Sequence, residues 1–219
     1  MIWIAFFQCI WYNNIAIIIL QYYSVVIVLN NNVMIPVEGN WDEGFVFSEY
    51  SIQSTYLGED AFGIKRFDTT YTEIGRLLHA MKYNGHFDTS VEIAERCIPY
   101  LQRWLSGTRI DSVLPTPPTN ERTAQPVYMI AEQIAEKMGI PYTDTVLVKT
   151  DDTPAKSMAK DNKQLKGTIV QQRAAKRECN ILLIDDFYST GSTANECVSV
   201  LKSDPLIDKV YYFAIAKTK

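Results

Sequence analysis

Residues 181–193, Ile-Leu-Leu-Ile-Asp-Asp-Phe-Tyr-Ser-Thr-Gly-Ser-Thr, decide the fold that we expect for this chain. The stretch opens with a short, branched apolar run, residues 181–184, which is typical of a strand buried on both faces of a parallel sheet. Asp185 and Asp186 follow directly. Because ligands of parallel sheets bind at the carboxyl ends of the strands, we expect both carboxylates to lie in a ligand site.

A loop of small, hydroxyl-bearing residues, 189–193, follows the acids and opens a helix. Gly191 lets the backbone approach a ligand closely, and the helix N-terminus directs N–H groups and a positive dipole end at an anion. The loop can therefore bind a phosphate, while the carboxylates accept protons from hydroxyl groups. The stretch predicts a site for a phosphorylated sugar. The alternative is a buried strand with an acidic turn and a Ser/Thr N-cap, which binds nothing.

The same stretch resembles the phosphoribosyl pyrophosphate (PRPP) signature of the type I phosphoribosyltransferases. That signature is a hydrophobic strand, two acids, three variable residues and Thr-Gly-x-Thr. The resemblance implies that Asp185 and Asp186 are the catalytic acids and bind the 3′ and 2′ hydroxyls of the ribose. It further implies a set of residues around the 5′-phosphate: Tyr188, Ser189, Thr190, Gly191, Ser192 and Thr193.

Composition fits an enzyme of one domain. The chain has 219 residues, of which 47% are hydrophobic, and this length suits a single core. A net charge of −4 gives no general electrostatic reason to bind nucleic acid. The four cysteines form no CxxC pair, so we expect buried thiols in a reducing cytoplasm rather than a zinc cluster or disulfide framework.

The N-terminal residues 1–33 form an uncharged, apolar extension, since no Asp, Glu, Lys or Arg precedes Glu38. A membrane anchor is one interpretation, because roughly 20 apolar residues cross a bilayer. Polar interruptions and the lack of flanking Lys or Arg speak against it. A mis-assigned start, with initiation at Met34, is the second interpretation, and a buried extra element is the third. We predict residues 34–219 as the catalytic domain, cytoplasmic unless the extension anchors it to a membrane.

Periodicity predicts an α/β fold with a parallel-sheet, Rossmann-like core. Strands are expected at 110–115, 145–149, 181–184 and 210–216, and the clearest helix begins at Pro126 and ends at Gly139. Before this core, alternation from Gly44 to Ile52 predicts a strand, which we assign to a small antiparallel N-terminal hood.

Three segments together look like the ComF family, competence-associated and amidophosphoribosyltransferase-like: Pro117–Pro126, Lys149–Gly167 and 181–193. The resemblance covers roughly residues 42–219. Two departures are the absence of an N-terminal cysteine zinc module and lysines in place of the usual arginines of the mobile loop. The alternatives to an enzyme are a non-catalytic PRPP-binding regulator and an accessory protein for DNA uptake.

The resemblance implies that a nitrogen nucleophile displaces pyrophosphate from carbon 1 of PRPP. Mg²⁺ would be bound mainly through PRPP, with no metal site built from side chains. The partners are then PRPP and an unidentified amine or base, and a homodimer is one option for the assembly. Ser189 stands where purine-salvage relatives place an acid, which disfavours hypoxanthine or guanine. The candidate pyrophosphate contacts are Arg122, Lys156 and Lys160.

Overall fold

A computed structural model describes residues 34–118, 124–150 and 168–218, and the backbone of three earlier strands. The chain divides into two compact units, 1–33 and 34–219. In the first unit, an antiparallel sheet is formed by β1 (Phe7–Tyr12), β2 (Ile15–Leu20) and β3 (Val25–Asn30). Within the described part of the chain, no helix has the length and apolar character that crossing a membrane requires.

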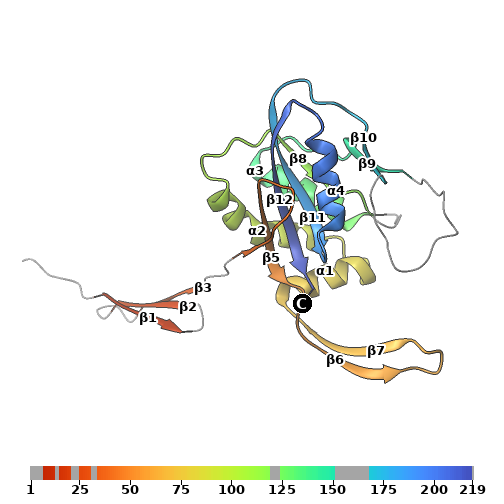
Figure 1. The fold of residues 1–219 in the computed structure, drawn as a ribbon. Helices are drawn as coiled ribbons and strands as arrows, with labels where there is room; N and C mark the ends of the chain where they lie inside the picture. Colours follow the sequence, from red (N-terminus) through yellow and green to blue (C-terminus); the bar gives the residue numbers. More distant parts are fainter. Residues whose placement is uncertain are drawn as a thin grey trace, which may run out of the picture. The chain divides into compact units, whose positions relative to one another are not determined.

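The second unit is built on a five-stranded sheet in the order β4-β5-β12-β11-β8 (Figure 1). Its strands are β4 (Ile35–Pro36), β5 (Glu43–Glu49), β8 (Ser112–Pro115), β11 (Cys179–Tyr188) and β12 (Ile207–Lys217). Strands β5, β12, β11 and β8 run parallel to their neighbours, and β4 is an antiparallel edge. The predicted α/β fold with a parallel core is therefore confirmed.

Helices cover both faces of this sheet. Three of them, α1 (Glu73–Asn84), α2 (Thr89–Trp104) and α3 (Pro126–Met138), share one hydrophobic core with Leu182 and Ile184 of β11. The fourth, α4 (Ser192–Leu201), shares the opposite core with Ile181 and Leu183. Successive side chains of a strand point to opposite faces, so an uninterrupted apolar run is what a sheet covered on both sides requires.

The strand predicted from Gly44 to Ile52 is present, but its first part lies in the core. Val46 packs in the core of α4, and Phe47 packs in the core of α1–α3, so both faces of β5 are buried and it joins the parallel sheet. The antiparallel pair of this region comes next: β6 (Ser51–Glu59) and β7 (Lys65–Tyr71) form a hairpin. Figure 1 shows this hairpin extending away from the sheet.

The strand that we predicted at 145–149 exists, but its assignment to the parallel core sheet is wrong. It is present as β9 (Leu147–Lys149), but it pairs antiparallel with β10 (Ile169–Gln171), outside the five-stranded sheet. The chain first passes the free edge of β8, where the Val113 N–H donates to the Pro141 carbonyl at 2.8 Å. There Val113 and Tyr142 form an isolated parallel bridge, and Pro141 has no N–H with which to extend it.

Candidate active site

The two predicted catalytic acids lie where β11 loses one of its two neighbours. Pairing with β8 ends at Ile184, opposite Pro115, whereas pairing with β12 continues to Tyr188. Asp185 and Asp186 are therefore still in strand conformation, but one side of the strand is open. This places both carboxylates at the carboxyl edge of the parallel sheet, as the sequence predicts.

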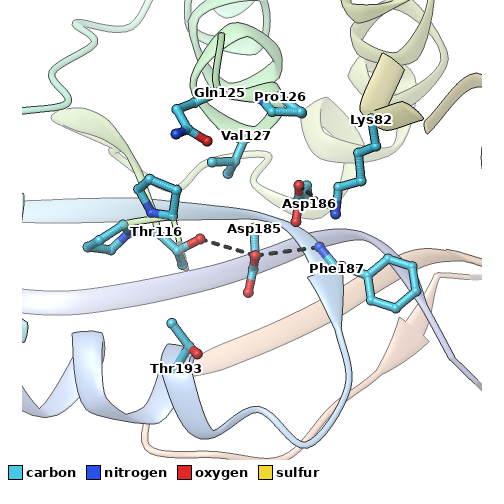
Figure 2. Close-up of a pocket in the computed structure, with 11 residues that line it drawn as sticks. Lys82, Thr116, Gln125, Pro126, Val127, Asp185, Asp186, Phe187 and Thr193 are labelled. Carbon is cyan, nitrogen blue, oxygen red and sulfur yellow. Dashed lines mark hydrogen bonds and ion pairs between the residues drawn. The ribbon is translucent and has the colours of Figure 1, made fainter. Parts of the chain in front are cut away.

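Asp185 is bound by three neutral donors. The Tyr212 hydroxyl donates to Oδ2 at 3.0 Å. The Thr116 hydroxyl and the Phe187 N–H donate to Oδ1 at 3.1 and 3.4 Å (Figure 2). Burial raises the pKa of Asp185 to about 6, the charge of Asp186 adds to this rise, and the three hydrogen bonds oppose it. Asp185 therefore changes charge close to neutral pH.

Asp186 is instead paired with a cation, Lys82 of α1. The Lys82 Nζ lies 2.8 Å from Asp186 Oδ2, and both side chains are only 17% exposed. The same Nζ lies 5.1 Å from the centroid of the Phe187 ring. Sequence reasoning missed Lys82, since its one signal was a basic residue in the last turn of a helix, where it also complements the dipole.

The loop after the acids has the conformation that an anion site requires. Gly191 has φ 72° and ψ 5°, a left-handed conformation that favours glycine, and it is the N-cap of α4. A Cβ at this position would lie 2.9 Å from Cε2 of Tyr188. Because α4 begins at Ser192, the N–H groups of its first turn have no partner within the helix. The loop therefore offers backbone donors at the strand end.

Two adjoining cavities open at this edge. One of about 250 Å³ is lined by both acids and by Lys82, Thr116, Pro117, Pro118, Gln125, Pro126, Val127, Phe187 and Thr193 (Figure 2). A second of about 70 Å³ is lined by residues 187–194 and Asp185. The cavities share Asp185, Phe187 and Thr193. The predicted acids and the predicted phosphate loop thus come together in one continuous site.

The predicted pyrophosphate contacts, Arg122, Lys156 and Lys160, lie outside the described residues. The start of the loop after β8 is described, and Thr116, Pro117 and Pro118 line the larger cavity. This segment lines the same cavity as both acids.

The side chains of the site could contribute to a metal site but do not form one alone. Over residues 34–118, 124–150 and 168–218, no group of three or more His, Cys, Asp or Glu residues could hold a metal ion. Asp185 and Asp186 are hard oxygen ligands of the kind that Mg²⁺ prefers. They suit an ion that is coordinated mostly by the oxygens of a bound ligand.

No family model and no curated protein matches the chain. Among solved structures, an adenine phosphoribosyltransferase is similar over 78% of this chain and 87% of its own, with 12% identity and a TM-score of 0.45. The Trypanosoma brucei enzyme, in complex with AMP, pyrophosphate and ribose-5-phosphate, matches over 84% and 86%, with 13% identity and a TM-score of 0.45. That of Leishmania tarentolae matches over 84% and 94%, with 11% identity and a TM-score of 0.44. TM-scores below 0.5 do not assign an activity, so function is argued from the site.

Proposed function

We propose that this chain is a phosphoribosyltransferase, which binds PRPP and transfers the phosphoribosyl group to a nitrogen nucleophile with release of pyrophosphate. One observation carries the proposal: an acid pair and a left-handed glycine loop line two cavities that adjoin at Asp185. A sugar phosphate offers a partner for each kind of group. The carboxylates accept from ribose hydroxyls, and the loop donates N–H groups to the 5′-phosphate.

In the proposed reaction, the bond from carbon 1 to the pyrophosphate oxygen breaks and a bond from carbon 1 to nitrogen forms. The nucleophile gives up a proton to solvent water, and pyrophosphate leaves with the electron pair of the broken bond. Asp185 and Asp186 orient the ribose and place negative charge near the positive charge that develops on the ring. The protein forms no covalent bond. Bound Mg²⁺ would neutralise charge on the leaving group.

The acceptor is proposed to be an amine or a base other than hypoxanthine or guanine. Ser189, four residues after Asp185, has no carboxylate with which to take a proton from such a base. The likeness of the segment Pro117–Pro126 and of residues 181–193 to ComF proteins favours a ComF-like, amidophosphoribosyltransferase-like subgroup. In this scheme Pro117 and Pro118 form part of the cavity wall, next to Thr116, which donates to Asp185.

Ligand binding tests the proposal. PRPP with Mg²⁺ should raise the melting temperature of the full chain, because a ligand that binds only the folded state stabilises it. The double variant Asp185→Asn, Asp186→Asn should lose this shift. The matched control, Asp68→Asn with Asp208→Asn, removes two exposed carboxylates outside the cavities and should keep it. If the double variant at Asp185 and Asp186 keeps the full increase in melting temperature, these acids do not bind the ribose.

Turnover separates an enzyme from a regulator. Pyrophosphate release from PRPP and Mg²⁺ should be measured with ammonia, glutamine and free bases as acceptors. We expect release with at least one of them. Tight PRPP binding without release with any acceptor would favour the non-catalytic regulator instead.

A further inference from the structure

Lys82 places a positive charge inside the larger cavity. Its Nζ is held 2.8 Å from Asp186 Oδ2 with 17% of the side chain exposed, so it is neither fully buried nor free in solvent. Figure 2 shows Lys82 extending from α1 toward Asp186. Among the described residues that line this cavity, Lys82 is the only cationic one. The cavity therefore presents a fixed cation to any anionic ligand.

The charges of the site give a cation at this position a role in binding PRPP. Asp185 and Asp186 repel an anion, and the larger cavity that they line is where the pyrophosphate group would lie once the 5′-phosphate is in the loop. Lys82 cancels the charge of one carboxylate by its ion pair. An ammonium has three donor protons, so it can donate to a phosphate oxygen and to Asp186 together.

We propose that Lys82 is a substrate-binding residue that binds a pyrophosphate oxygen of PRPP, while Asp186 positions its ammonium group. This inference rests on the proposed function and adds a source of specificity to it. Ribose 5-phosphate carries the same ribose and 5′-phosphate but no pyrophosphate. Lys82 therefore makes the site prefer PRPP over ribose 5-phosphate.

Calorimetry on the full chain at fixed Mg²⁺ tests this with three ligands: PRPP, ribose 5-phosphate and inorganic pyrophosphate. Lys82→Met should weaken PRPP and pyrophosphate by about 10- to 100-fold, the loss of one charged hydrogen bond, and leave ribose 5-phosphate unchanged. Lys82→Arg should recover most of the loss, because it keeps the charge. Lys137→Met removes a comparable 3.0 Å ion pair, with Glu95, outside the cavity and should bind all three like the wild type.

A purely structural role for Lys82 gives a different result. If Lys82→Met weakens the binding of PRPP and of ribose 5-phosphate equally, or weakens neither, the inference is overturned.

A second variant serves in case Lys82→Met does not fold because its Asp186 carboxylate has lost its cation. The double variant Lys82→Met, Asp186→Asn leaves no unpaired carboxylate. In this double variant, the ratio of the affinity for PRPP to the affinity for ribose 5-phosphate should be as low as in Lys82→Met. A ratio equal to that of the wild type would show that Lys82 does not bind pyrophosphate. A wild-type chain that binds neither sugar overturns the proposed function as well.

Discussion

Asp185 and Asp186 are neighbours in sequence but lie in different chemical environments. Side chains alternate between the two faces of a strand, so Asp186 of β11 lies on the same face as Ile184. This face is covered by α1, and there Asp186 pairs with Lys82. Asp185 lies on the same face as Leu183, the opposite one, and there it accepts a hydrogen bond from the hydroxyl of Tyr212. Strand geometry turns the two acids to opposite faces, and the elements packed on those faces give one acid a cation and the other only neutral donors.

This difference makes ligand binding depend on the ionisation of Asp185, whose pKa is raised to about 6 by burial and then by Asp186. The ionised form accepts a ribose hydroxyl, so PRPP affinity should fall as pH drops from about 8 to about 5. Calorimetry across this range measures it. Asp185→Asn should remove this component and leave only the titration of the phosphate groups, whose second pKa is near 6. An identical pH profile in this variant would contradict the assignment.

The contribution of Asp185 to stability should change with pH in the direction opposite to its contribution to PRPP binding. The pKa of Asp185 in the folded chain lies above its ordinary value of 3.8, so between about pH 4 and about pH 6 the folded state binds more protons than the unfolded state. The contribution of Asp185 to the free energy of unfolding therefore decreases as pH rises through this window, and then stays constant. Denaturant titrations of the wild-type chain and of Asp185→Asn should show this contribution as a difference: the free energy of unfolding of the wild type relative to that of the variant should decrease as pH rises through this window.

At the scale of elements, the sequence predicted those parts whose signals are local. These parts are the apolar run of β11, helix α3 with its C-terminal Gly139, and the loop before α4. Each is marked by residues within its own segment, such as an apolar run, a capping glycine or a turn glycine. Sheet membership depends instead on which edges are free in the folded chain. Periodicity therefore found β5 and β9 but assigned neither to its correct sheet. Lys82 was missed for the same reason, since only packing of α1 brings it to Asp186.

The loop before α4 should bind phosphate chiefly through backbone N–H groups. Gly191→Val forces a branched side chain into a left-handed conformation and against the Tyr188 ring, so the loop must change shape. Ser192→Ala removes one hydroxyl hydrogen bond, worth on the order of 1 kcal/mol, while keeping the backbone. PRPP affinity, measured by calorimetry on folded variants, should fall far more for Gly191→Val. Equal losses would show that hydroxyl groups are the main phosphate ligands.

At the scale of the whole molecule, every group assigned to the site belongs to the second unit. The acids, Lys82, Thr116 and the loop 187–194 come from elements of the five-stranded sheet or from the helices that cover it. The sheet, its two hydrophobic cores and both cavities are formed by residues after Val33. PRPP binding should therefore need only this unit.

Deleting residues 1–33 should leave a chain that melts cooperatively and keeps the stabilisation by PRPP and Mg²⁺. The physical reason is that the two units are separately compact and that residues 34–219 contain two hydrophobic cores of their own, among the residues whose burial the structure describes. Thermal melts of the full and shortened chains, with and without PRPP, measure this directly. An equal shift in both would place binding in the second unit. Aggregation of the shortened chain, while the full chain stays soluble without detergent, would show instead that residues 1–33 cover apolar surface of the domain, and the boundary at Met34 would then be wrong.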